Sequence, residues 1–340
     1  MVAGNPRRTA KRRHLGLYAT FEHGDEIAFP GYYAVDLPHV GVEVELTATP
    51  RVGVHRYTFA EEAAPEIQIH VTNALGQGRS DAGVVRVVPE AREVEGSVRT
   101  FGSFSGRYGG IEVFFVARAN LPIADVGTWQ GEDARDSEPA EAETTATGND
   151  VGVVLRFERD GANTPLELKV GLSYVSVEGA RRNLEAEAGE LDFDGVLARA
   201  KEAWEEKLGR ARVSGGTPKQ QTIYYTALYH ALVMPSIASD VDGRYIGFDK
   251  QVHEAEGFNY YTDMSLWDTF RTAHPLYTLI ARREQRDMVR SLVAMAREGG
   301  YLPRWPSGNG YTNSMFGTPA DFVIAESYLK GIRDFDVEFA

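Results

Sequence analysis

The sequence predicts an N-terminal antiparallel β-sandwich, a linker helix and a C-terminal helical region. In the first half, short runs alternate apolar and polar residues, as in the segment Val-Glu-Val-Glu-Leu at 42–46, and this alternation is typical of half-buried strands. Near residue 190 the apolar spacing changes to that of a helix. We therefore predict a sandwich at 1–190, a helical linker at 191–215 and a helical domain at 216–340.

The alternating runs of the first half are separated by turn-forming residues. Further runs of this kind occupy residues 67–71, 111–115 and 166–170. Between the runs lie Gly- and Asn-containing turns at 73–78, 106–110 and 160–161. Many short strands without an intervening helical pattern favour an antiparallel sandwich.

Residues 130–150 interrupt this pattern, because they are acidic, rich in Ala and Thr and free of large apolar residues. Such a composition cannot bury enough apolar surface to form part of a core. We predict an exposed, mobile insertion between strands.

The linker is predicted as one amphipathic helix. Val196, Ala200, Trp204 and Leu208 recur every four positions, and Asp194 is placed to cap the helix start. We expect Trp204 to pack on a core.

Helical patterns dominate after residue 218. They predict helices over residues 219–233, 266–281, 286–297 and 319–329, bounded by prolines and glycines. Such helices, joined by long loops, are typical of a helical barrel or of stacked helical hairpins. Because four helices cannot close a large helical barrel, we expect the chain to be a fragment of a longer protein.

Composition excludes several classes of function. The 340 residues carry a net charge of −13, which disfavours nucleic acid and anionic membranes as partners, and contain no cysteine for disulfides or zinc–thiolate sites. No apolar run approaches the roughly 18 residues of a membrane span. The basic segment at 1–17 lacks the apolar stretch of a secretory signal, so the localisation stays open. The sequence does not indicate the oligomeric state either.

Residues 260–274, here called the first wall, combine aromatic, acidic and basic side chains around one predicted helix start. They include Trp267, Asp268, Arg271 and His274. An indole can pack on the apolar face of a sugar ring, while a carboxylate and a guanidinium bind its hydroxyls. However, Ser265 and Asp268 also have the spacing of a helix-capping box, so the residues alone leave a sugar site and a structural cap equally open.

Residues 299–319, here called the second wall, form a long segment without strand or helix periodicity. Trp305, Asn309 and Asn313 supply an aromatic ring and neutral hydrogen-bonding groups, which commonly line carbohydrate clefts. An ordinary surface loop is the alternative, but loops of this length inside a compact domain are often functional. For the aromatic stretch 224–230 we predict a core position, including a buried His230.

Hydrolysis of a glycosidic bond normally needs two carboxyl groups, one protonating the leaving group and one activating water. No such pair is evident in the helical region. Phosphate-binding loops, zinc-binding HExxH and GxSxG motifs are also absent from the sequence.

Several motifs resemble glycoside hydrolase family 92. The run SLWDTFRTAHP at 265–275 is similar to the family's SLWDTxRxxHP segment, and GYLPRWP at 300–306 resembles its GxLPxWP loop. The similarity continues through 313–331. Upstream, 32–36, 45–51 and 55–57 are similar to the family's sandwich domain.

This resemblance implies a calcium-dependent, inverting exo-α-mannosidase with a β-sandwich, a helical linker and an (α/α)6 barrel. By the same resemblance, Trp267 and Asp268 contact the terminal mannose of an α-mannoside or N-glycan, Arg271 orients Asp268, and the Trp305 loop shapes the pocket. The family's catalytic acid and base motifs and its principal calcium-binding segment do not occur here. We expect them beyond Ala340, so that no catalytic residue is assigned and the fragment alone is inactive. The alternative is a non-catalytic carbohydrate-binding fragment. Residues 318–321 also depart from the histidine-bearing sequence of the family.

Overall fold

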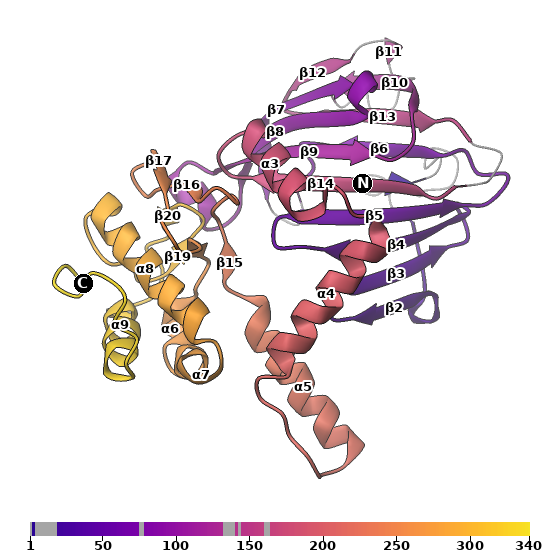
Figure 1. The fold of residues 1–340 in the computed structure, drawn as a ribbon. Coiled ribbons are helices and arrows are strands. Elements are labelled where there is room, and N and C mark those ends of the chain that lie inside the picture. Colours follow the sequence, from indigo (N-terminus) through magenta and orange to yellow (C-terminus); the bar gives the residue numbers. More distant parts are fainter. Residues whose placement is uncertain (1, 4–18, 75–77, 132–139, 142–143, 160–163) are drawn as a thin grey trace. The chain divides into compact units, whose positions relative to one another are not determined.

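The computed structural model describes residues 2–3, 19–74, 78–131, 140–141, 144–159 and 164–340. They divide into two compact units (Figure 1). The first unit comprises Met1–Gly102 and Glu112–Glu202, and the second comprises Ser103–Ile111 and Ala203–Ala340.

The first unit contains two antiparallel sheets, as the alternating sequence runs predict. The larger sheet has nine strands in the order β12-β7-β8-β9-β14-β5-β4-β3-β2, and the smaller has five in the order β1-β6-β13-β10-β11. The strands of the larger sheet are β2 Glu26–Phe29, β3 Tyr32–Leu37, β4 Val42–Ala48, β5 Val52–Phe59, β7 Arg79–Val88, β8 Glu93–Phe101, β9 Ile111–Ala119, β12 Thr145–Gly148 and β14 Leu166–Ser173. Those of the smaller sheet are β1 Val2–Ala3, β6 Glu66–His70, β10 Ile123–Gln130, β11 Ala140–Glu141 and β13 Val151–Phe157.

A single apolar core joins the two sheets face to face, which confirms the predicted sandwich. Val44 and Tyr57 of the larger sheet and Ile67 and Val153 of the smaller sheet are all buried in it. In β4 the alternation of buried Val42 and Val44 with exposed Glu43 sets which face points inward. The short 3-10 helices η1 His23–Asp25 and η2 Pro89–Ala91 connect strands at the edges.

A helix that the sequence analysis did not predict covers the outer face of the larger sheet. This helix is α3, Val177–Ala188, and the side chain of Ser176 caps its start by accepting from the backbone N–H of Gly179 at 3.0 Å. Its Leu184 is fully buried beside Val52 and Val54 of β5. The missing side chain of Gly171 on β14 permits this approach, because an added Cβ would lie 2.4 Å from the carbonyl oxygen of Ala180.

The segment at 130–150 is not simply an insertion between strands. Thr145–Gly148 forms β12, which pairs with β7 at the end of the larger sheet, and its Ala146 is buried. The prediction of mobility rests mostly on residues 132–139 and 142–143, which lie outside the described residues. The predicted turn residues 75–77 and 160–161 also lie outside them.

The linker is one helix, α4, spanning Phe193–Leu208. Asp192, and not Asp194 as predicted, caps its first turn by accepting from the backbone N–H of Gly195 at 2.8 Å. Asp194 pairs instead with Arg56 at 2.9 Å. Trp204 is half-buried, and its ring centroid lies 4.7 Å from that of Tyr229 on the next helix.

The second unit is mainly helical, with short hairpins between the helices. Its helices are α5 Pro218–Val233, α6 Leu266–Thr269, α7 Ala273–Ile280, α8 Arg282–Gly299 and α9 Pro319–Leu329. Its two-stranded sheets are formed by β15 Ser236–Ile237 with β18 Tyr261–Thr262, β16 Arg244–Ile246 with β17 Val252–Glu254, and β19 Pro306–Ser307 with β20 Gly310–Tyr311. The core packs α7, α8 and α9 together around buried residues such as Tyr277, Leu292 and Val323.

The predicted helix at 266–281 is broken into α6 and α7. Pro275 explains the break, since a proline cannot donate to the carbonyl four residues before it and its ring clashes with that carbonyl. In an unbroken helix that carbonyl would belong to Arg271. The chain therefore restarts at Ala273, which places Pro275 in the first turn of α7, where it is tolerated.

Helix α5 is largely exposed, which contradicts the predicted core position of the stretch 224–230. Leu228 is its only buried residue, and His230 is exposed. Within the described residues, no helix is long and apolar enough to span a membrane.

Candidate functional site

The first wall has an unusual backbone. After β18, Asp263 and Ser265 adopt positive φ angles of 56° and 46°. Residues other than glycine rarely occupy this left-handed region, and such positions are concentrated at functional sites. The short helix α6 follows directly and carries Trp267 and Asp268.

Asp268 does not cap its own helix, so the capping interpretation of the Ser265–Asp268 spacing is wrong. Ser265 has left-handed backbone angles, and its side chain makes no capping hydrogen bond. The backbone N–H of Asp268 donates to the Ser265 carbonyl at 2.9 Å. Its carboxylate is exposed and has no hydrogen bond or ion pair to any described residue. This acceptor group is available to a ligand.

Arg271 lies beside two aromatic rings. Its guanidinium carbon is 4.9 Å from the centroid of Trp267 and 4.7 Å from that of Phe270. No ion pair joins Arg271 to Asp268 in the described part of the chain, so the expected orientation of Asp268 by Arg271 is not observed. The stacked arrangement nevertheless keeps five N–H donors at the surface of the wall.

His274 lies in the interior of the second unit, apart from the exposed groups of the first wall. It is only 1% exposed, and its Nδ1 lies 2.8 Å from Oε1 of Gln285 on α8. Because the amide nitrogen of Gln285 donates to Ser327 on α9, its Oε1 is the acceptor and His274 carries its proton on Nδ1. Burial lowers the pKa of His274 to about 4, so the ring is neutral. In this position His274 links three helices through Gln285 and Ser327.

The second wall contains the β19–β20 hairpin. Trp305 precedes it, and its indole N–H has no hydrogen-bond partner among the described residues. Asn309 lies at the hairpin turn, where both its side-chain and backbone oxygens accept from Nζ of Lys250 at 2.9 and 2.7 Å. Asn313 follows the hairpin, is exposed and has a positive φ of 53°.

The two walls are joined directly. Asp263 of the first wall accepts from the hydroxyl of Ser307 at 2.9 Å and from the backbone N–H of Gly308 at 3.1 Å. The hydroxyl of Thr262 donates to the carbonyl of Gly308 at 2.6 Å. The structure thus connects the two segments that carry six of the seven predicted residues, through Thr262 and Asp263 and not through the predicted residues themselves, whereas His274 is buried.

A third segment belongs to this assembly, although the sequence analysis treated it only as a turn. The 3-10 helix η3, Ser105–Tyr108, belongs to the second unit. Arg107 and Tyr108 donate to backbone carbonyls of the second wall, and Phe104 lies against Trp305 with ring centroids 4.4 Å apart. In the sequence, the pair Gly109-Gly110 indicated only a tight turn at this position. Both glycines have positive φ in the structure.

Left-handed backbone is concentrated in this assembly. Seven non-glycine residues of the described chain have positive φ. Five of them belong to the walls or contact them: Lys250, Asp263, Ser265, Asn313 and Met315. This concentration, together with the exposed Asp268 and Arg271, marks the assembly as the candidate site.

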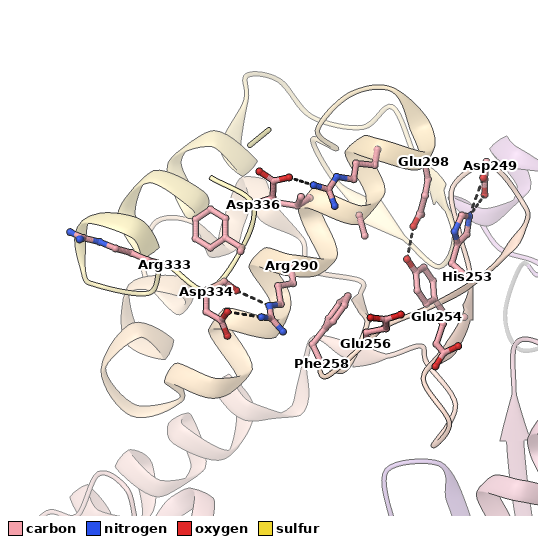
Figure 2. Close-up of a pocket in the computed structure, with 15 residues that line it drawn as sticks. Asp249, His253, Glu254, Glu256, Phe258, Arg290, Glu298, Arg333, Asp334 and Asp336 are labelled. Carbon is pink, nitrogen blue, oxygen red and sulfur yellow. Dashed lines mark hydrogen bonds and ion pairs between the residues drawn. The ribbon is translucent and has the colours of Figure 1, made fainter. Parts of the chain in front are cut away.

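A separate pocket of about 680 Å³ lies beside α8 and is lined by none of the seven predicted residues (Figure 2). Arg290 pairs there with Asp334 at 2.7 Å, and Arg297 pairs with Asp336. Glu298 accepts from the Tyr245 hydroxyl at 2.5 Å, and burial raises the pKa of Glu298. Because these charged groups already satisfy one another, a ligand would have to compete with them, and the pocket is the weaker candidate.

The expected calcium ion has no evident place among the described residues. They contain no group of three or more His, Asp or Glu side chains that could hold a metal ion. Calcium needs six to eight oxygen ligands, whereas Asp263 already uses one carboxylate oxygen within the protein. The described residues therefore do not fit a complete calcium site.

The described residues form a β-sandwich followed by helices, and the first wall carries aromatic, acidic and guanidinium groups. Two family descriptions match the chain: the glycosyl hydrolase family 92 N-terminal domain over residues 2–173 and the glycosyl hydrolase family 92 catalytic domain over residues 179–340. The chain belongs to glycosyl hydrolase family 92.

Solved structures and a curated relative are similar over most of the chain. The family GH92 alpha-mannosidase BT3965 from Bacteroides thetaiotaomicron, in complex with mannoimidazole, has a TM-score of 0.86 and 28% identity, covering 95% of this chain and 42% of that one. The family GH92 inverting mannosidase BT2199 from the same species has a TM-score of 0.86 and 25% identity, covering 99% and 43%. An uncharacterized secreted glycosidase from Arthroderma benhamiae is 24% identical, covering 90% of this chain and 37% of its own length. The chain therefore spans about two fifths of the length of these relatives.

Proposed function

We propose that the two walls bind the terminal sugar of an α-mannoside or N-glycan, as part of a longer glycoside hydrolase that inverts configuration. Family membership supports the reaction class, and the similarity to alpha-mannosidases, one of them in complex with mannoimidazole, supports the sugar. The observation that carries the proposal is the exposed carboxylate of Asp268, which has no partner among the described residues and lies next to Trp267 in the sequence.

The chemistry of this wall suits a pyranose. The carboxylate of Asp268 accepts hydrogen bonds from sugar hydroxyls, and the guanidinium of Arg271 donates to their oxygens. The indole of Trp267 offers an apolar face to the C–H groups of the ring. These interactions hold a sugar, but they do not transfer protons.

Proton transfer is assigned to carboxyl groups outside the two walls. The walls contain only two acidic residues, and Asp263 is used to hold Ser307 and Gly308. Asp268 is then the one carboxylate left, whereas inverting hydrolysis requires two, roughly 6.5–9.5 Å apart. We therefore expect this chain to bind a mannoside and not to hydrolyse it. The calcium dependence implied by the family resemblance remains a prediction.

The test is a calorimetric titration of the chain with methyl α-mannoside, with methyl α-glucoside as the ligand control. We expect Asp268→Asn to weaken mannoside affinity by roughly tenfold or more, because a hydrogen bond to a charged group contributes about 1.5–3 kcal/mol. Asp36→Asn is the matched control, since Asp36 is another exposed carboxylate, on β3 of the sandwich. Equal affinity of the Asp268→Asn variant and the unmodified chain would remove Asp268 from the site.

A further inference from the structure

The 103–111 turn, defined as Ser103–Ile111, lies between two strands of the sandwich but belongs to the second unit. Its helix η3 ends at Gly109, which has a φ of 97° and donates its backbone N–H to the Ser105 carbonyl. Gly110 has a φ of 87° and donates to the same carbonyl at 2.8 Å. These two glycines reverse the chain tightly and leave Arg107 and Tyr108 directed at the second wall.

Arg107 and Tyr108 hold the two ends of the β19–β20 hairpin. Nη1 of Arg107 donates to the Thr312 carbonyl at 2.6 Å and to the Ser314 hydroxyl at 2.8 Å. The hydroxyl of Tyr108 donates to the Ser307 carbonyl at 2.5 Å. One short turn therefore anchors the entry and the exit of the hairpin.

The packing between the 103–111 turn and the hairpin is close. The ring of Tyr108 lies so near Gly310 that an added Cβ would be 2.4 Å from its Cγ. Nζ of Lys250 lies 4.5 Å from the centroid of the same ring while it donates to Asn309. Only glycine at 310 permits this contact, so the sequence of the hairpin is matched to the ring of Tyr108.

The second wall has little regular backbone structure of its own. Strands β19 and β20 are each two residues long. Asn313 and Met315, which follow the hairpin, are in the disfavoured left-handed region and persist only when their surroundings determine their conformation. Arg107 donates hydrogen bonds to Thr312 and Ser314, the residues on either side of Asn313, and so helps to fix the backbone conformation of Asn313.

We propose that Arg107 and Tyr108 are positioning residues: they fix the second wall, and with it Trp305 and Asn313, in the geometry that receives the sugar. This inference rests on the proposed function for the identity of the ligand, although the positioning itself can be measured without ligand. Neither residue transfers a proton or contacts the sugar in this role.

The experiment compares Arg107→Ala with Arg99→Ala. Arg99 is the control, because it is also an arginine that donates a hydrogen bond, to Asp81 at 2.8 Å, and lies over a phenylalanine ring, but on the sandwich. The first readout is hydrogen exchange of the peptide 305–316, measured by mass spectrometry without ligand. We expect Arg107→Ala to accelerate its exchange by roughly tenfold, since two hydrogen bonds from a charged donor are lost, and Arg99→Ala to leave it unchanged. Tyr108→Phe should accelerate the exchange of the same peptide by a smaller factor.

The second readout is the affinity for methyl α-mannoside. We expect roughly tenfold weaker binding for Arg107→Ala, an intermediate value for Arg107→Lys and an unchanged value for Arg99→Ala. Unaltered exchange of peptide 305–316 in Arg107→Ala would overturn the positioning role. Accelerated exchange with unaltered affinity would also overturn it, because the wall's geometry would then not matter for the sugar. If the unmodified chain itself shows no mannoside binding, the proposed function fails, and the exchange result still decides whether Arg107 fixes the wall.

Discussion

At the scale of single residues, His274 connects helices through one hydrogen-bonded chain. Its Nδ1–H donates to Gln285, whose amide donates to Ser327, whose hydroxyl donates to the Val323 carbonyl at 2.7 Å. Each member of this chain is buried, so each would be costly to leave unpaired. The hydrogen bond to Gln285 requires a proton on Nδ1, and burial keeps the ring neutral.

This arrangement predicts a pH-dependent stability. Between pH 6.5 and about 4, His274 is protonated in the unfolded chain but not in the folded one. The unfolded state then binds more protons, so the free energy of unfolding falls as the pH is lowered through this window and is fully recovered above it. The shift corresponds to a loss of about 3 kcal/mol at pH 4, measurable by urea unfolding at a series of pH values.

The control for this prediction is His274→Asn, which keeps a donor for Gln285 and cannot titrate. Its stability should change less between pH 6.5 and 4 than that of the unmodified chain, whatever its absolute value. Parallel pH profiles for the two proteins would show that His274 is not the titrating group.

Asp268 shows where sequence reasoning about a single residue reaches its limit. The spacing of Ser265 and Asp268 fits a cap and a ligand-binding group equally well. The positive φ of Ser265 excludes the cap, because the serine side chain then makes no capping bond, and the ligand-binding role of Asp268 stays a prediction. That angle depends on the surrounding fold, including the contacts of the neighbouring Asp263 with a loop more than forty residues away, and is not encoded in the local pattern.

At the scale of elements, periodicity predicted the positions of the strands and helices better than their interruptions. The bounds of α9 and the end of α5 agree with the prediction. Pro275 marks the break before α7 in the sequence, whereas α3 is hard to predict because its sequence, VEGARRNLEAEA, carries few apolar residues. The 103–111 turn could not be placed from sequence, since Arg107 and Thr312 are 205 residues apart.

The contact between Tyr108 and Gly310 gives an element-scale prediction. Gly310→Ala places a methyl group against the ring of Tyr108, and we expect the hairpin to be destabilised by about 1–3 kcal/mol, as for other overpacked sites. Urea unfolding followed by tryptophan fluorescence measures this change.

The matched control is Gly106→Ala in the 103–111 turn, where an added Cβ meets nothing within 4 Å and the effect should be within about 0.5 kcal/mol. A double-mutant cycle with Tyr108→Ala should remove most of the Gly310→Ala effect. If the two substitutions change the free energy of unfolding additively, the cost of Gly310→Ala does not come from contact with the Tyr108 ring.

At the scale of the whole molecule, the described helices differ greatly in how well they are packed. Helix α8 buries nine of its residues, whereas α5, of similar length, buries only Leu228. Helix α5 also exposes apolar side chains, with Ile223 58% and Val233 49% exposed. Most helical stability in proteins comes from packing, so the capping box between Thr217 and Gln220 matters more for α5 than a cap would for a well-packed helix.

This difference predicts uneven opening of the second unit. Amide hydrogens of α5 should exchange at least about tenfold faster than those of α8, because local opening of α5 exposes little additional apolar surface. Thr217→Ala removes the capping box, which contributes about 1 kcal/mol, and should accelerate exchange in α5 without changing α8. Protection of α5 equal to that of α8 would contradict the prediction and would mean that its apolar side chains are covered in solution. Sedimentation over a range of concentrations would then show whether a second copy of the chain covers them.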